Sequence, residues 1–122
     1  MHELGLCDDI VAAVQRRAAG RTVRRVRVRV GCLLHVHPDA FEQSFAIAAA
    51  VTVAGGATAE LVVEPVQLGC PTCGQTTTSF GPVPACPACG SVDVEHNGGL
   101  ELVLESLVYE SEEQPHVPGH PG

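Results

Sequence analysis

The sequence has no lysine and no tryptophan, and it contains only three phenylalanines and one tyrosine in 122 residues. Nucleic-acid binding needs basic surface and often aromatic rings for stacking. A formal net charge of −7 therefore argues against a nucleic-acid partner. All basic residues are arginines that lie between Arg16 and Arg29. A short chain with so few large side chains builds a weak core, so another interaction is expected to stabilise part of it.

Long apolar runs are also absent. The longest candidate, Phe45 to Ala54, is alanine-rich and falls well short of the ~18 residues of a membrane span. The N-terminus lacks the basic and apolar regions of a secretion signal. We therefore expect a cytoplasmic protein with no membrane contact, in which the six cysteines stay reduced and serve as metal ligands more readily than as disulfides.

Hydrophobic periodicity predicts an α+β fold. Two helices are predicted, over residues 3–19 and from Pro38 to about Ala54. Alternation of apolar and polar residues predicts three strands, over residues 22–31, 58–66 and 100–109. The two helices should pack on one face of the three-stranded sheet. An insert should leave and return through adjacent strand ends.

The composition divides the chain into three parts. Residues 1–66 and 99–110 are expected to form a base domain, and residues 67–98, rich in Cys, Pro, Gly and Thr, an inserted domain. Residues 111–122 lack periodicity and are expected to be a disordered tail. In the base, Arg25, Arg27 and Arg29 should share one face of a strand. A solvated sheet face is the favoured interpretation, and a surface for an acidic partner is the alternative.

The strongest motif is a pair of C-P-x-C-G sequences in the insert, formed by Cys70, Cys73, Cys86 and Cys89 with their following glycines. A two-residue gap lets both thiolates of a pair reach one ion, so the spacing predicts a tetrahedral four-sulfur zinc site. Apart from Phe80 and a few valines the insert has little apolar bulk, so metal binding should supply much of its folding energy. Such a closed site is structural and not catalytic.

Other uses of these cysteines are weaker hypotheses. A redox dithiol needs one C-x-x-C at a helix start, and a rubredoxin-like iron site uses the same four ligands. A zinc-ribbon module for protein interaction or nucleic-acid binding is the main alternative function, although the insert has no basic residue and contains Asp93 and Glu95. His96 is interpreted as an exposed histidine, with a position near the zinc as the alternative.

The N-terminus, Met1-His2-Glu3, offers a second metal site. The terminal amine, the His2 amide nitrogen and the His2 imidazole can chelate one ion in a plane, an arrangement suited to Ni(II) or Cu(II) once a fourth donor completes it. Taken alone, a histidine at this position is more commonly an ordinary exposed residue.

The two motifs occur together with the Val/Arg strand that ends at Gly31, the second helix start at Pro38 and the segment Leu102-Val103-Leu104-Glu105-Ser106-Leu107. In this combination, over about residues 1–110, the chain resembles the HypA/HybF family of hydrogenase-maturation nickel metallochaperones. The resemblance implies Ni(II) as cargo at the N-terminus and structural Zn(II) in the insert.

By position, the resemblance makes His2 the essential nickel ligand, with the Met1 amine and the backbone amides of His2 and Glu3 as further donors. Glu3 would tune that site, and Cys70, Cys73, Cys86 and Cys89 would hold zinc. The implied partners are a nickel-handling GTPase and the large-subunit precursor of [NiFe]-hydrogenase. The expected protein is a carrier, not an enzyme, and a monomer or weak dimer.

The remaining cysteines and histidines depart from the motifs. Cys7 and Cys32 are isolated and are expected to be buried small hydrophobic residues. His35 and His37 are favoured as ordinary loop histidines, although their spacing allows a shared metal in an extended loop. His116 and His120 lie in the tail and carry no assigned role.

Overall fold

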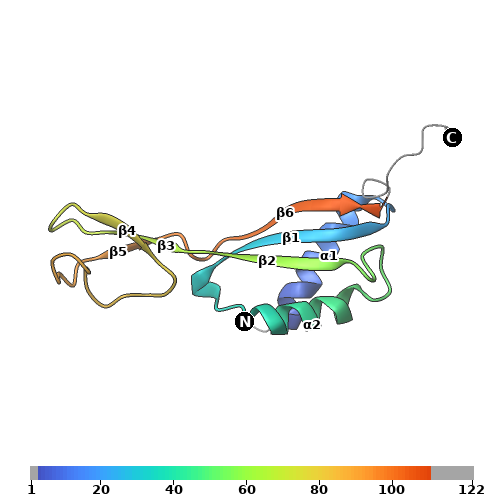
Figure 1. Cartoon of the computed structure of the whole chain (residues 1–122), viewed down its shortest axis with the longest axis horizontal. Coiled ribbons are helices and arrows are strands. Elements are labelled where there is room, and N and C mark those ends of the chain that lie inside the picture. The colour runs from blue at the N-terminus through green and yellow to red at the C-terminus, as the bar shows by residue number, and fades with distance from the viewer. Residues whose placement is uncertain (1–2, 111–122) are drawn as a thin grey trace.

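A computed structural model describes residues 3–110, which form two α-helices, one short 3-10 helix and six strands (Figure 1). In chain order these are α1 (Glu3–Ala18), β1 (Val23–Gly31), η1 (Cys32–Leu34), α2 (Pro38–Ala49), β2 (Thr58–Glu64), β3 (Val66–Gly69), β4 (Thr76–Ser79), β5 (Glu95–Asn97) and β6 (Leu102–Tyr109). The strands form two sheets, ordered β2-β1-β6 and β4-β3-β5. The predicted α+β class is confirmed. The predicted tail lies outside the described residues.

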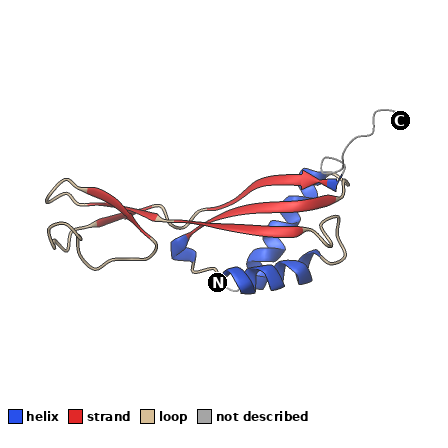
Figure 2. Ribbon diagram, viewed as in Figure 1, coloured by secondary structure: helices blue, strands red, loops and turns tan. Residues whose placement is uncertain are grey.

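β1 is the central strand of the first sheet, which we call the base sheet. It runs parallel to β2 and antiparallel to β6, with Val28 opposite Leu61 on one side and Leu104 on the other. The expectation of adjacent strand ends is wrong, because β2 and β6 occupy opposite edges. The crossover through α2 returns β2 to one side of β1, so only the other side is left for β6. The helices lie beside this sheet, and the second sheet extends away from them (Figure 2).

The main core joins both helices to one face of β1. Val26 and Val28 are fully buried, as the alternating pattern predicts, and they contribute to the same cluster as Leu6 and Val14 of α1. From α2, Phe41 and Phe45 enter this cluster at spacing i, i+4, with ring centroids 6.1 Å apart. Full burial of a side chain of this size contributes on the order of 2 kcal/mol. Two of the three phenylalanine rings are thus fully buried in the main core.

α2 ends at Ala49, five residues before the predicted end near Ala54. The Thr52 hydroxyl causes this difference. It donates a hydrogen bond to the Ala49 carbonyl (2.8 Å) and accepts one from the Ala54 N–H (3.1 Å). Threonine side chains compete with helical backbone bonds in this way, so the chain turns where its apolar composition alone predicts continued helix.

The open face of the base sheet carries an ion-pair network that favours the solvated-face interpretation. Arg27 contacts Glu60 of β2 (2.9 Å) and Glu105 of β6 (2.7 Å), and Arg29 lies 3.7 Å from Glu105. The carboxylates raise the pKa of Arg27. Glu105 reaches both arginines because the β1–β6 register shifts beside it, so that it is the extra residue of a β-bulge. The pairs are exposed and contribute little individually.

A second, smaller core lies where the base sheet meets the second sheet. It contains Cys32, Val66 and Leu68, with Leu33, Val63, Val83 and Val94 packed against it. Phe80, the largest apolar residue of the insert, is instead 68% exposed. Backbone hydrogen bonds from Gly31 N–H to Glu101 O and from Leu33 N–H to Gly99 O (both 2.8 Å) close this junction. The base therefore supplies part of the apolar packing that the insert lacks.

Within residues 3–110, neither α-helix combines the length and the hydropathy that crossing a lipid bilayer requires.

The close approach at the junction makes Gly31 sensitive to substitution. A Cβ atom at this position would collide with the backbone of Gly99 and the Glu101 carboxylate. We expect Gly31→Ala to lower the free energy of unfolding by roughly 1–3 kcal/mol, as overpacking does, measured by urea denaturation. Gly5→Ala is the matched control, because a Cβ there meets nothing within 4 Å. It should stabilise α1 by up to about 1 kcal/mol. Equal stability of Gly31→Ala and the parent would contradict the prediction.

Candidate metal centre

Two loops with the same backbone pattern carry the four cysteines of the insert. In the first, the Gly74 N–H donates to Cys70 O (2.8 Å) and the Cys70 N–H to Gln75 O (3.0 Å). In the second, the corresponding bonds join Gly90 to Cys86 and Cys86 to Ser91 (both 2.8 Å). Gly74 and Gly90 have φ of 76° and 78°, a conformation that glycine adopts readily. This is the left-handed turn expected from the C-P-x-C-G motif.

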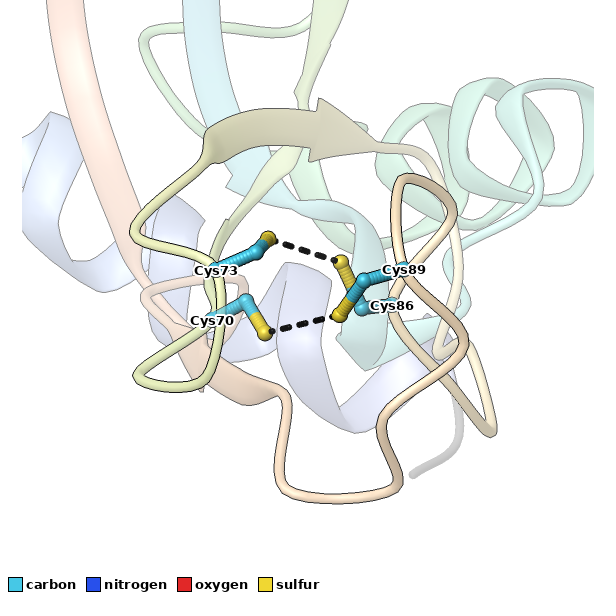
Figure 3. Close-up of side chains that lie close together, drawn as sticks. All are labelled: Cys70, Cys73, Cys86 and Cys89. Carbon is cyan, nitrogen blue, oxygen red and sulfur yellow. Dashed lines mark hydrogen bonds between the residues drawn. The ribbon is translucent and has the colours of Figure 1, made fainter.

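The loops face each other and gather the four sulfurs (Figure 3). Cys70 Sγ lies 3.6 Å from Cys89 Sγ, and Cys73 Sγ lies 3.8 Å from Cys86 Sγ. All four atoms are within 4.8 Å of one another. Sulfurs bound to one zinc at about 2.3 Å in tetrahedral geometry would lie about 3.8 Å apart. The spacing of the four sulfurs therefore fits a tetrathiolate metal site.

The two halves of the cluster differ in exposure. Cys70 and Cys86, the first cysteine of each loop, are buried, whereas Cys73 and Cys89 are exposed. Cys70 directly follows β3, so the edge of the second core leads into the cluster. The Ala88 N–H points at Cys86 Sγ (3.4 Å), and Thr72 and Ser91 join the two loops through their hydroxyls (3.0 Å). The loops are thus tied together by groups other than the thiols.

Before a metal binds, the four thiols have divergent pKa values. The Cys73 N–H is the main cause that lowers the pKa of Cys70 to about 6, and it outweighs desolvation. For Cys89, the Ser91 N–H acts in the lowering direction, but desolvation and the three neighbouring thiols together raise the pKa to about 12. Backbone N–H groups thus favour the thiolates of Cys70 and Cys86, whose pKa values are lowered, and crowding of the thiols opposes ionisation of Cys73 and Cys89, whose pKa values are raised. A divalent cation removes this repulsion.

The structure separates the other predicted residues from this cluster. His96 is exposed on β5, and its Nε2 accepts a hydrogen bond from the Val83 N–H (3.1 Å). Cys7 and Cys32 are buried, as predicted, and Cys32 contacts Ser79 O through its thiol (3.6 Å). His35 and His37 are exposed in the loop before α2. Among the described residues, the four cysteines of the insert are the only group of three or more His, Cys, Asp or Glu side chains placed to hold one metal ion.

The residues of the predicted nickel site lie at the start of the chain, where the described residues begin. Met1, His2 and the side chain of Glu3 lie outside the described residues, whereas the Glu3 backbone begins α1. Sequence reasoning missed the Thr72–Ser91 contact and the bond between His96 and Val83. The Thr72–Ser91 contact has a weak signal in the sequence, because each cysteine loop contains a residue with a hydroxyl group. The hydrogen bond between His96 and Val83 has no such signal, because the two residues are thirteen positions apart.

Loss of one cysteine of the cluster should abolish stoichiometric zinc. We expect Cys86→Ser to bind less than one zinc per chain by elemental analysis and to lose dispersion of the insert's NMR signals, because a site with three thiolates is open and poorly supported. Cys32→Ala is the matched control, a buried cysteine outside the cluster, and should retain one zinc. Retention of full zinc by Cys86→Ser would contradict this assignment.

Zinc binding should release protons, because Cys89 with a pKa of about 12 and Cys73 with a raised pKa are protonated near neutrality and must ionise to coordinate. We expect release of on the order of two protons per zinc at about pH 7.5, and weaker apparent affinity as the pH falls. Calorimetry in buffers of different ionisation enthalpy measures the number of protons released per zinc bound. A binding enthalpy that does not depend on the buffer would contradict the predicted proton release.

Comparison with known proteins identifies relatives over almost the whole chain. A family model described as HypA, hydrogenase/urease nickel incorporation, metallochaperone, matches residues 1–109. The hydrogenase maturation factor HypA 2 of Bradyrhizobium diazoefficiens is 34% identical over 110 residues, which cover 88% of this chain and 97% of that protein. The hydrogenase maturation factor HypA of Rippkaea orientalis is 36% identical over 110 residues, with coverage of 90% and 96%.

Solved structures show the same fold. The solution structure of a HypA protein superposes with a TM-score of 0.63 at 25% identity, covering 92% of this chain and 98% of that one. The Ni metallochaperone HypA from Helicobacter pylori superposes with a TM-score of 0.61 at 24% identity, covering 89% and 97%. With its sequence matched from residue 1 to 109 and its fold shared, the chain belongs to the HypA family of nickel metallochaperones for hydrogenase maturation, a family of metal carriers and not of catalytic enzymes.

Proposed function

We propose that this chain binds Ni(II) through Met1-His2-Glu3 and delivers it, with a nickel-handling GTPase, to the large-subunit precursor of [NiFe]-hydrogenase. The proposal depends mainly on one observation: the sequence Met1-His2-Glu3, whose nitrogens could chelate nickel, leads into α1 in a chain that belongs to the HypA family. In the same proposal Cys70, Cys73, Cys86 and Cys89 hold a structural zinc ion.

The chemistry of the first residues suits a cargo site. The terminal amine, the His2 amide and the His2 imidazole form fused chelate rings, and planar nitrogen donors favour Ni(II) and Cu(II). The Glu3 N–H is one of the first N–H groups of α1, which have no partner within the helix. Once this N–H gives up its proton to solvent, its nitrogen could serve as a further donor, and the Glu3 carboxylate would adjust the charge of the site.

Transfer requires that the ion can leave. Each donor of a terminal site can be replaced in turn by a partner's ligand, and protonation of the His2 imidazole weakens binding further. The tetrathiolate cluster has opposite properties, since four thiolates close the coordination sphere. The two proposed sites thus have different roles: the terminal site binds its cargo ion reversibly, and the tetrathiolate cluster holds a permanent structural ion.

α1 gives the proposed nickel site a fixed support. The helix buries Leu6, Ile10 and Val14 against the main core, each at most 4% exposed. The charged residues Asp8 and Asp9 are exposed on its other side. The proposed chelating residues are therefore joined to a firmly packed helix.

His2→Ala is expected to weaken Ni(II) binding by at least about 100-fold. Removal of a metal ligand lowers metal affinity more than removal of a residue that only hydrogen-bonds to a ligand. Calorimetry on untagged protein measures the affinity. In cells that lack their own HypA protein, the variant should fail to restore [NiFe]-hydrogenase activity.

His120→Ala provides the control, since His120 lies beyond the residues that the family model matches. It should bind nickel and restore hydrogenase activity like the parent, and both variants should keep one zinc. Survival of Ni(II) binding and hydrogenase maturation in His2→Ala would refute the carrier role of the N-terminus.

A further inference from the structure

The outer edge of β2 has the features of a strand that accepts a further strand. β2 forms the edge of the base sheet nearest α2 (Figure 1), and it pairs with β1 alone. The register runs without a shift from the Arg25–Thr58 pair to the Gly31–Glu64 pair. On the other side of β2, its backbone groups make no hydrogen bond to any described residue. Such an unpaired row of N–H and C=O groups is a template for another strand.

The usual protections of an edge strand are found on β6, the opposite edge, and not on β2. Edge strands are commonly protected by bulges, prolines or lysines. The β1–β6 register is interrupted by shifts, whereas residues 58–64 pair without interruption and include no proline and no basic residue. Glu60, near the middle of β2, contacts Arg27 of β1 (2.9 Å), which draws its side chain over the sheet and away from the outer edge. The edge of β2 is therefore regular and open.

A groove lies beside the start of this edge, between β2 and α2. It has a volume of about 200 Å³ and is lined by Glu42, Phe45, Ala46, Ala57, Thr58 and Ala59. The alanines leave room in the groove, and the buried Phe45 ring makes its base apolar. Alternate side chains of an added strand would point to the helix side of the sheet. An aliphatic side chain at one of these positions would enter the groove.

The surroundings of the groove are acidic. α2 and β2 together carry Asp39, Glu42, Glu60 and Glu64 and no basic residue. Glu60 is paired with Arg27, but Glu42 is exposed at the groove and forms no ion pair with another described residue. A basic side chain in the occupant would complement Glu42. A second copy of this chain fits poorly, because a two-fold pairing of β2 strands would bring these acidic residues together.

We propose that the β2 edge binds an extended segment of a partner protein as a fourth strand of the base sheet. On its face towards α2, the segment would carry an aliphatic side chain for the groove and, two residues away, a basic side chain for Glu42. Main-chain hydrogen bonds would supply affinity, and these two side chains would supply specificity. The inference goes beyond the proposed function, because it concerns the docking of a protein segment and involves no nickel ligand.

The test uses the zinc-loaded full chain and a synthetic β-hairpin peptide, closed by a disulfide, whose outer strand has valine and arginine two residues apart on one face. A rigid hairpin loses little conformational entropy on binding. Added peptide should slow amide hydrogen exchange in residues 58–64 and shift the NMR signals of these residues, Glu42 and Ala46. A hairpin with glutamate in place of the arginine should bind at least about 10-fold more weakly.

Variants of α2 locate the binding site. Ala46→Arg places a long cationic side chain in the groove and should weaken binding of the arginine hairpin by at least about 10-fold. Gln43→Arg is the matched control, because Gln43 is exposed on the same helix, does not line the groove and gains the same charge. It should bind the hairpin like the parent. Glu42→Gln should have an intermediate effect, because it removes the attraction and leaves the groove open.

Absence of binding, equal binding of the two hairpins, or parental binding by Ala46→Arg would overturn the inference. It would also be overturned if the signals of residues 58–64 changed on dilution of the protein alone, because the occupant would then be a second copy. None of these results bears on nickel binding, which His2→Ala tests separately.

Discussion

The alternation of valine and arginine along β1 is the constraint on which the rest of the structure depends. Its valines bury one face of the strand against both helices, and Arg27 and Arg29 on the other face hold Glu105 of β6 and, through Arg27, Glu60 of β2. β1 is also the shared neighbour of the two outer strands. A shift by one residue would put arginines into the core and valines into water. The register of the base sheet is therefore fixed from both faces at once.

The second sheet depends on this arrangement because it is connected to both edge strands of the base sheet. The chain passes from β2 into β3, and it returns from β5 into β6. Only Pro65 separates β2 from β3, and Cys32 packs with Val66 and Leu68 across the junction. The thiol cluster lies beyond that small core. A metal ion bound by these thiols would complete a folding unit whose near end the base already supports. The expectation that metal supplies much of the folding energy of the insert stays a prediction, and it concerns the far end, where apolar contacts are few.

Local patterns predicted most of the elements. The period-2 alternation of residues 22–31 and the paired C-P-x-C-G motif each encode their geometry within a few residues, and the structure reproduces the strand and the gathered sulfurs. The end of α2 was misjudged because one hydroxyl, on Thr52, overrides an apolar composition. Strand order and the bulge at Glu105 depend on pairing between distant segments, which a single sequence does not display. The nickel residues rest on chemistry and on the resemblance, because Met1 and His2 lie outside the described residues.

The burial of Cys7 has a consequence for metal selectivity. A thiolate competes strongly with nitrogen and oxygen donors for soft and borderline ions, and Cys7 stands only one turn after Glu3. Its sulfur faces inward, fully buried, with the Phe41 carbonyl as its acceptor. The protein thereby keeps its nearest thiol away from the chain terminus. In the proposed carrier role, a cargo ion at the terminus would therefore meet no thiolate, which favours exchange over trapping.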